Sequence, residues 1–584
     1  MSYDNSGLLS VPDLKNEEDP TDVVQVAATI QELLGIQSPS FPAILDLIAE
    51  LPFEASMSYL SVLAAGLYHA RRDTRLHLRL AYEVFGDGPM IDQTRRFLAN
   101  GASRIVFDER YLIVLQRLLV EHAGNDQTRH LTRAQHASLL TCLFGLGDAL
   151  DEREPPAPDE DGDYDVPAWT TYTIQRGAYY NTPDMLEGIV RTTTMLTEIA
   201  SEQDLLKHHA HCPLESWSRQ DANGASPADQ LAYGLALITA LKILDPSLRL
   251  ADRPTSLEPG YMADSAFADR EAQISDAVSA TREDLRAMYT RAGSTPAHIA
   301  WDHAPFEQRP LLRRADESLI LISPTAIESW MGRGLYFRML DSARSRQRAG
   351  DFTTFMGALA ERYVLRLVSR SHDPEFPVVA AEVSGDRPYR IGKRELRTPD
   401  IVLAQPPDLV LMEVYSGRIP RAARISGNLD AIEAALDKLI LKKLTELNNR
   451  IGDLLTGQMP LPGVTDLHGL RVWPMLVLTG DHIFQLPMLW RWVRERLPEG
   501  VFGDARVQPP AICNLDDLEP LLALVERGES LPELLSAFHG SQLAQFPPRN
   551  WIAATHSLPL SERPAYVQTR YKAVMNGSHR LLFP

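Results

Sequence analysis

Cysteine and long apolar runs are both scarce in this chain of 584 residues. The three cysteines, Cys142, Cys212 and Cys513, are widely spaced and odd in number, which argues against a framework of disulfide bonds. No apolar run approaches the roughly 20 residues that a transmembrane helix needs. The segment from Met1 to Pro20 is acidic and polar, so it lacks the basic and apolar parts of a signal peptide. These absences predict a cytoplasmic protein that does not enter a membrane.

Three sequence motifs that mark common catalytic or nucleotide-binding sites are absent as well. The sequence contains no GxxxxGK[ST] loop for nucleotide phosphates, no GxSxG turn and no HExxH pair. Each of these motifs places a phosphate, a nucleophile or a metal through a defined local geometry. Their absence disfavours ATP-driven translocation and also disfavours hydrolysis by a serine or by zinc.

Positive charge is deficient overall but concentrated in one region. The net charge of −19 disfavours broad affinity for nucleic acid, because the protein would repel phosphate. The residues that we nevertheless predict to bind nucleic acid are Arg390, Lys393, Arg394, Arg397 and Arg418. The ordinary alternative is a solvated basic loop on an acidic protein.

The hydrophobic pattern divides the chain into regions. Apolar residues recur at helical spacing in 23–150 and in 169–305, which are separated by an acidic, proline-rich linker or loop over 151–168. Residues 1–22 are typical of a flexible tail, and 306–350 predict a β-hairpin followed by an arginine-rich helix. Residues 351–584 alternate helices with strands. The sequence therefore predicts a mixed fold, with a mainly α-helical N-terminal half and a C-terminal α/β domain.

The stretch RTPDIVLAQPPDLVLMEVYSGR, residues 397–418, carries the candidate site. Its two short apolar runs predict strands on either side of a Pro-Pro turn. If these strands pair, Asp400 at the start of the first and Glu413 at the end of the second return to one end of the sheet. Two carboxylates held together are costly unless a cation lies between them. The stretch therefore predicts a cation site.

The elements around this stretch follow a distinctive order. They are a helix over 351–369, a strand over 378–383, the two strands of the hairpin, a helix over 429–455 and a strand over 472–478. With Pro399-Asp400 and Glu413-Val414-Tyr415 in this order of elements, residues 351–500 resemble the PD-(D/E)xK nuclease superfamily. The resemblance implies a restriction-endonuclease-like core within 351–584.

The resemblance also implies an activity: metal-dependent hydrolysis of phosphodiester bonds in nucleic acid, with DNA favoured, in a restriction-like or antiviral defence system. Asp400 and Glu413 would hold Mg²⁺ or Mn²⁺. Glu361 occupies the place of the acidic residue often found on the first core helix, and it would join them through water. The helical N-terminal half would then sense a trigger or bind a protein partner.

One position departs from the family pattern. The lysine expected two places after Glu413 is Tyr415, which brings no positive charge. In the superfamily this role sometimes moves to a neighbouring element, and we expect Lys438 on the following helix to supply it. Arg418 and Lys442 are other cations close by in the sequence. The alternative is a catalytically inactive protein that keeps the nuclease fold as a scaffold or as a module that binds nucleic acid or protein.

Overall fold

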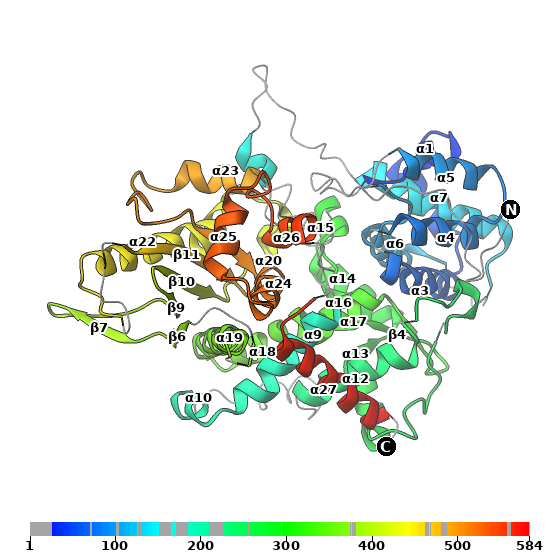
Figure 1. The fold of residues 1–584 in the computed structure, drawn as a ribbon. Coiled ribbons are helices and arrows are strands. Elements are labelled where there is room, and N and C mark those ends of the chain that lie inside the picture. The colour runs from blue at the N-terminus through cyan, green and yellow to red at the C-terminus, as the bar shows by residue number, and fades with distance from the viewer. Residues whose placement is uncertain are drawn as a thin grey trace.

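The fold is mixed, with helices dominating the N-terminal half and an α/β arrangement towards the C-terminus (Figure 1). The structure is a computed structural model that describes residues 26–70, 73–100, 104–124, 128, 130–150, 165–170, 174, 185–209, 227–243, 245–254, 256–293, 295–373, 375–376, 381–461, 467, 469–480, 487–556 and 562–582. The predicted tail and residues 151–164 of the predicted linker lie outside these ranges. Within them, no helix combines the length and apolar character needed to span a membrane.

The N-terminal lobe, residues 26–150, is a set of helices around one hydrophobic core. Leu63, Leu112, Leu115 and Leu143 are among its fully buried side chains. The lobe contains β1 (Val26–Ala27), α1 (Ile30–Leu34), α2 (Phe41–Ala49), α3 (Phe53–Ala70), α4 (Thr74–Phe85), α5 (Pro89–Ala99), β2 (Arg104–Ile105), α6 (Glu109–His122) and α7 (Arg133–Leu150). The predicted helical region is confirmed, and the short parallel pair β1–β2 is an addition that the sequence pattern did not indicate.

The middle lobe, residues 165–345, is also mainly helical. Its described elements are α9 (Met185–Thr193), η1 (Thr194–Glu198), η2 (Ile199–Ser201), α10 (Gln203–His208), α12 (Pro227–Ala240), η3 (Leu250–Asp252), η4 (Ala268–Arg270), α13 (Glu271–Val278), β3 (Ser279–Ala280), α14 (Arg282–Ala292), α15 (Pro296–Trp301), α16 (Ala304–Gln308), β4 (Leu311–Arg313), β5 (Leu319–Leu321), α17 (Pro324–Met331) and α18 (Arg333–Ser345). The predicted hairpin is β4–β5, and the predicted arginine-rich helix is interrupted at Gly332 between α17 and α18.

A small sheet of order β3-β4-β5 separates the two hydrophobic cores. Side chains alternate between the faces of a strand, so neighbouring residues point in opposite directions. Leu311 joins the core shared by the middle lobe and the C-terminal region, whereas Leu312 joins the core of the N-terminal lobe. Leu321 likewise joins the shared core, and Ile320 joins the core of the N-terminal lobe. The β4–β5 hairpin therefore lies between the two cores and contributes side chains to both.

The C-terminal region is built on a five-stranded sheet of order β12-β11-β10-β9-β6. The strands β10 and β9 are antiparallel, as are β9 and β6, while β10, β11 and β12 run parallel. The region contains α19 (Ala349–Ser371), β6 (Glu382–Gly385), β7 (Pro388–Ile391), β8 (Arg394–Arg397), β9 (Ile401–Gln405), β10 (Asp408–Tyr415), α20 (Arg421–Ser426), α21 (Leu429–Leu436), η5 (Asp437–Leu441), α22 (Lys442–Leu455), β11 (Arg471–Leu478), α23 (Pro487–Arg496), β12 (Ala511–Asn514), α24 (Leu515–Glu526), α25 (Leu531–His539), α26 (Pro548–His556) and α27 (Ala565–Leu582).

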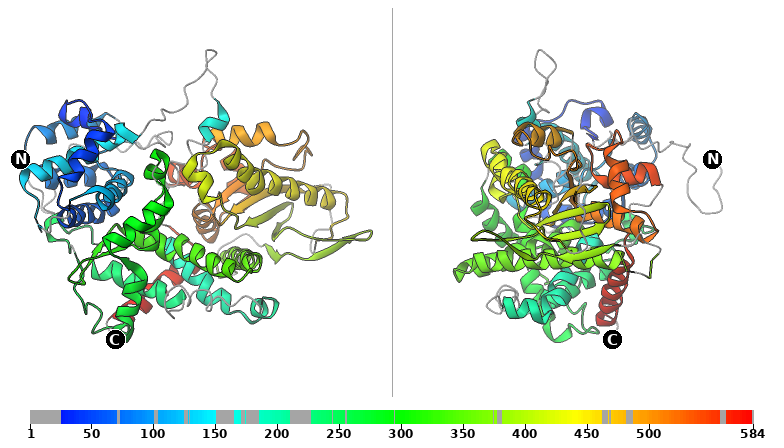
Figure 2. Two further views of the ribbon diagram at one scale, coloured as in Figure 1. Left: turned by 180° about the vertical axis from the view of Figure 1, so that it is seen from behind. Right: turned by 60° about the vertical axis from the view of Figure 1, so that its left-hand side comes forward.

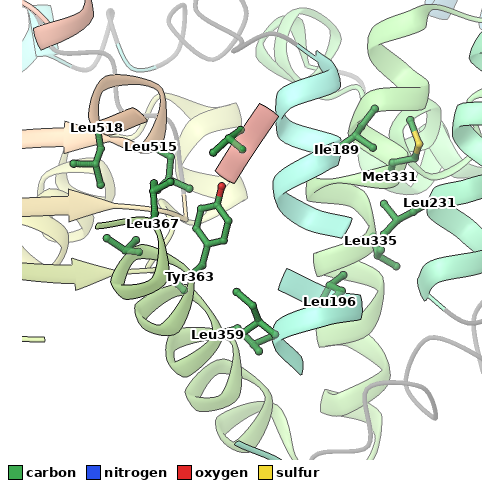
Figure 3. Packing of buried hydrophobic residues seen from close by; sticks show 14 of the residues in the cluster. Ile189, Leu196, Leu231, Met331, Leu335, Leu359, Tyr363, Leu367, Leu515 and Leu518 are labelled. Atoms are coloured by element: carbon green, nitrogen blue, oxygen red, sulfur yellow. The ribbon is translucent and has the colours of Figure 1, made fainter. Parts of the chain in front are cut away.

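Helices cover both faces of this sheet (Figures 1 and 2). Val410 and Met412 of β10 point into the core that contains α19 and α24, whereas Leu409 and Leu411 pack against α22 on the other face. A strand buried on both faces reads as a continuous apolar run, which is what residues 409–412 show. Figure 3 shows the first of these cores, where side chains of α19 lie between α24 and helices of the middle lobe.

The core does not end at the predicted domain boundary between residues 350 and 351. Buried residues of α12 and α17 share one cluster with α19, α24 and the sheet. The C-terminal helix α27 also returns to the middle lobe, where it packs against α9 and α12. Residues 351–584 therefore form a sheet region that is structurally continuous with the middle lobe.

Buried charges reinforce this continuity. Arg191 of α9 lies against α24, with its Nη1 2.5 Å from Oδ1 of Asp516 and its Nε 2.7 Å from Oε1 of Glu519. Arg563, just before α27, places Nε 3.1 Å from Oε2 of Glu519, and the Tyr363 hydroxyl of α19 donates to Oε1 of the same carboxylate at 3.1 Å. Removing one partner of such a network leaves the others charged and buried, which costs several kcal/mol. The network fixes α9, α19 and α24 relative to one another.

Candidate active site at the end of the central sheet

Asp400 and Glu413 meet at one end of the β9–β10 hairpin, as predicted. The last pair of that ladder joins Ile401 to Met412, so Asp400 and Glu413 are the next cross-strand neighbours. Side chains in such a pair lie on the same face with Cβ atoms roughly 5 Å apart. The backbone N–H of Val414 donates to Oδ2 of Asp400 at 2.8 Å, which holds this carboxylate against the end of β10.

Glu361 reaches the same place from α19. This helix packs against β10, and a Cβ atom on Gly357 would lie 3.7 Å from Oγ of Ser416, just beyond the end of that strand. Glu361 follows Gly357 by one helical turn and is partly buried. Three acids that are far apart in the sequence are therefore gathered at one end of the sheet.

Burial and repulsion between neighbouring carboxylates change the ionisation of this cluster. Burial, together with Glu413 and Glu361, raises the pKa of Asp400 to about 8. Burial, together with Asp386 and Glu413, raises the pKa of Glu361 to about 7. Burial also raises the pKa of Glu413, although Arg450 and Lys443 act in the opposite direction. Perturbed groups clustered in this way are typical of functional sites.

Two cations from α22 contact Glu413. Nζ of Lys443 lies 3.5 Å from Oε1 of Glu413 and 2.7 Å from Oε2 of Glu446, and Arg450 pairs with Oε2 of Glu413. Lys443 also lies 5.1 Å from the ring centroid of Tyr415, within the range of a cation–π contact. Against the lowering effect of burial, Glu446 and Glu413 raise the pKa of Lys443. Tyr415 thus lies beside a lysine from the next helix.

Lys443, and not Lys438, is the lysine that the structure places against Glu413. Lys438 lies in η5 with an exposed side chain, and the Lys442 side chain is 67% exposed. The turn η5 is a π-helix, which closes after five residues instead of about four. The lysine one turn beyond Lys438 is therefore Lys443, whereas ordinary helical spacing indicates Lys442.

The predicted basic loop is a two-stranded ribbon instead. The strands β7 and β8 pair antiparallel around Gly392, whose φ of 60° favours glycine. Four predicted nucleic-acid-binding residues, Arg390, Lys393, Arg394 and Arg397, are all exposed on this ribbon. The ribbon ends three residues before Asp400, so it adjoins the carboxylate cluster directly.

Arg418 differs from the other residues predicted to bind nucleic acid. Its guanidinium lies 4.3 Å from the ring centroid of Tyr336 in α18, and the side chain is only partly exposed. This contact with the middle lobe gives Arg418 a packing role that the sequence pattern did not reveal. Two arginines of α18 are likewise held within the protein, since Arg333 pairs with Glu307 and Arg338 donates to Gln230.

The donor set has the chemistry of a site for a hard cation. Carboxylate oxygens are the ligands that Mg²⁺ and Mn²⁺ prefer, and a cation would relieve the repulsion that raises the pKa of Asp400 and Glu361. Within the described part of the chain, however, no three or more His, Cys, Asp and Glu side chains are arranged to hold a metal ion. In this arrangement Lys443 and Arg450 provide the positive charge next to Glu413.

Comparison with protein-family models, with curated proteins and with solved structures finds no match for this chain.

The sequence reasoning missed Asp386, Lys443 and Arg450. Asp386 follows β6, pairs with Arg397 and contributes to the raised pKa of Glu361. Lys443 and Arg450 are seven residues apart, and Glu446 lies between them, so all three lie along one side of α22. A search for charges that border the apolar face of this helix would have found them.

The raised pKa values predict how stability depends on pH. A carboxyl group whose pKa is higher in the folded state stabilises the protein fully below its unfolded pKa, and this stabilisation is lost as pH rises through the folded value. We therefore expect the metal-free protein to lose stability progressively as pH rises from about 4, the ordinary carboxyl pKa, until the pKa values of Glu361, about 7, and Asp400, about 8, have been passed. Asp400→Asn should remove this loss and stabilise the metal-free protein by on the order of 2 kcal/mol at about pH 9.

Thermal unfolding of both proteins between about pH 5 and pH 9 in a chelator measures this difference. Asp408→Asn is the matched control, because Asp408 lies at the opposite end of β10, where Oδ2 pairs with Arg471 at 2.6 Å. That change should lower stability across the whole range. If Asp400→Asn instead destabilises the protein most at high pH, the repulsion assigned to Asp400 is wrong.

Proposed function

We propose that this protein is a metal-dependent nuclease that hydrolyses phosphodiester bonds in DNA. The observation that carries the proposal is the meeting of Asp400, Glu413 and Glu361 at one end of a buried sheet. Burial raises all three pKa values, Glu413 raises those of Asp400 and Glu361 further, and Glu361 raises that of Asp400. Keeping like charges together in a protein interior is unfavourable. Binding of a divalent cation gives a physical reason for this arrangement.

The order of elements supports the family resemblance. The helix α19 is followed by the antiparallel strands β6, β9 and β10, then by the helices α20 to α22, and then by β11, which lies parallel to β10. This is the order expected of a restriction-endonuclease-like core. Lys443 beside Tyr415 supports it further, because it returns a positive charge to the position that the family lysine would occupy.

In the proposed reaction, each residue has a role set by its position. Asp400 and Glu413 would hold Mg²⁺ or Mn²⁺, with Glu361 joining through water. The metal would supply a bound water of lowered pKa and polarise the phosphate. Lys443 would offset negative charge developing on the phosphate. Lys443 and Arg450 would balance the charge of Glu413 until the metal binds.

Calorimetric titration of Mn²⁺ into the wild-type protein and into Asp400→Asn tests the proposal. We expect the wild type to bind Mn²⁺ and to lose affinity below about pH 7, because protons compete for carboxylates whose pKa values are about 7 and about 8. Asp400→Asn should weaken this binding at least about tenfold. Absence of measurable Mn²⁺ binding by the wild type at about pH 8 would remove the metal-dependent mechanism.

A noncatalytic module is the second candidate, and one observation favours it. Both carboxylate oxygens of Glu413 already contact cations of the protein itself, Lys443 and Arg450. Such pairs could replace a metal and keep the nuclease-like fold as a platform for nucleic acid. The Mn²⁺ titration separates the two candidates, because this module would bind DNA without binding the metal.

A further inference from the structure

The β7–β8 ribbon adjoins the candidate site, stands out from the protein body and is basic. It projects at the edge of the molecule in Figure 1 and in the left view of Figure 2. The side chains of Arg390 and Arg397 are 77% and 64% exposed, and they pair with Glu395 and Asp386. Neither Lys393 nor Arg394, at the tip, forms an ion pair with an acid of the described residues. Free positive charge is thus concentrated at the tip of an acidic protein.

The ribbon is firmly held at its base. The Tyr389 side chain is buried, and its hydroxyl donates to Oδ2 of Asp453 in α22 at 2.7 Å. Thr398 closes the ribbon, since its backbone N–H donates to the carbonyl oxygen of Arg387 at 2.9 Å and its Oγ1 accepts from the Arg387 N–H at 2.9 Å. A ribbon anchored in this way can present its tip in a fixed direction relative to the site.

From this geometry we infer that the ribbon enters the major groove of B-form DNA and positions the duplex on the candidate site. The inference rests on the proposed function and adds the substrate class, duplex DNA. Each strand has four residues. At about 3.4 Å per residue, the three residues from the buried Tyr389 to Gly392 at the turn place the tip roughly 10 Å from the anchor, which is comparable with the groove depth of about 8.5 Å. The major groove, about 12 Å wide, admits a two-stranded ribbon, whereas the minor groove, about 6 Å wide, does not.

The distance to the site agrees with this placement. Arg397 ends β8, and Thr398 and Pro399 lead to Asp400. Three extended residues span at most about 10 Å, which is close to the width of the groove. A ribbon seated in the groove would therefore bring a bordering phosphate strand to the carboxylates.

Other nucleic acids fit the ribbon less well. The major groove of A-form RNA is too deep and narrow for protein side chains to read. Proteins that bind single strands present aromatic rings on which bases stack. The aromatic residue of the ribbon, Tyr389, is buried and held by Asp453. The charge and shape of the ribbon therefore favour duplex DNA over duplex RNA and over single strands.

Fluorescence anisotropy with labelled oligonucleotides, in a chelator that prevents cleavage, tests the inference. The ligands are a DNA duplex, the RNA duplex and the single DNA strand of the same sequence, and the DNA duplex with glucosylated 5-hydroxymethylcytosine, whose sugars fill the major groove. We expect the wild type to bind the plain DNA duplex most tightly. The double variant Lys393→Ala/Arg394→Ala should lose at least about tenfold in affinity, and its salt dependence should fall by about two units of slope.

The control Arg344→Ala/Arg370→Ala removes the same charge from α18 and α19, where the two side chains are 61% and 64% exposed. It should bind as the wild type does. The inference is overturned if the ribbon variant keeps wild-type affinity, if the glucosylated duplex binds as tightly as the plain one, or if RNA or the single strand binds at least as tightly. Failure of the proposed function is distinguishable, because a noncatalytic protein would pass these tests and still cleave nothing in Mg²⁺ or Mn²⁺.

Discussion

Asp400→Asn should lower Mg²⁺-dependent cleavage of duplex DNA by at least about a thousandfold while leaving the protein folded. The substitution keeps the size of the side chain and its capacity to accept the N–H of Val414, but it removes the negative charge that would hold the metal. Loss of a bound metal removes several kcal/mol of transition-state stabilisation, and each 1.4 kcal/mol or so is a tenfold change in rate. Glu413→Gln should have an effect of the same order.

Single-turnover cleavage of a labelled duplex at saturating protein measures the chemical step without the contribution of DNA affinity. Asp408→Asn is again the matched control, because it removes a carboxylate from the same strand at the end remote from the site. It should lower the unfolding temperature and leave the cleavage rate of the folded protein unchanged. A rate for Asp400→Asn within tenfold of the wild type would contradict the assignment of this carboxylate.

Much of the fold follows from local patterns in the sequence. The apolar run at 409–412 indicates a strand covered on both faces, and the Pro-Pro turn indicates a hairpin, so the meeting of Asp400 and Glu413 could be predicted. The ribbon β7–β8 was missed because its signal is short. Only Tyr389, Ile391 and Leu396 are apolar among polar residues there. The surrounding arginines make the pattern of the segment more typical of a loop than of strands.

Contacts between segments that are distant in the chain could not be predicted from the sequence in this way. The boundary predicted at residue 350 followed a change of pattern from helical to alternating, but Arg191 and Glu519, which are far apart in the chain, bind each other across it. Residues 565–582 form a helix that also returns to the middle lobe. Their apolar side chains complete a core formed by α9 and α12. Such contacts depend on tertiary structure and leave no local periodicity that identifies the partner.

The choice of Lys438 differs from the contact that the structure shows, in a segment where the helix is irregular. Sequence reasoning assumed 3.6 residues per turn from 429 to 455, whereas η5 inserts a wider turn at Asp437–Leu441. The helix was predicted, and the lysine that contacts Glu413 is Lys443, five residues after Lys438. No residue type in 437–441 distinguishes a π-turn from an ordinary helical turn.

Lys443→Met should lower the cleavage rate about 100-fold to 1,000-fold, a range typical for loss of one group that stabilises developing charge. Lys438→Met and Lys442→Met are the matched controls, because both change an exposed lysine of the same helical segment. Neither should change the rate by more than about threefold. Affinity for duplex DNA should stay close to the wild-type value in all three variants, and Lys443→Met should not weaken Mn²⁺ binding, because it removes a cation that contacts Glu413.

A second substitution separates a role in charge stabilisation from a purely structural one. In the Lys443→Met background, Tyr415→Lys places an ammonium group on β10, two residues after Glu413, where the superfamily pattern has its lysine. The Tyr415 ring and Nζ of Lys443 lie 5.1 Å apart in the wild type, so the new ammonium group would enter the same space. We expect the double variant to recover at least about tenfold in rate. If Lys443→Met is slow only because it is unstable, the second substitution would leave the rate low, and the charge assigned to Lys443 would have no part in the reaction.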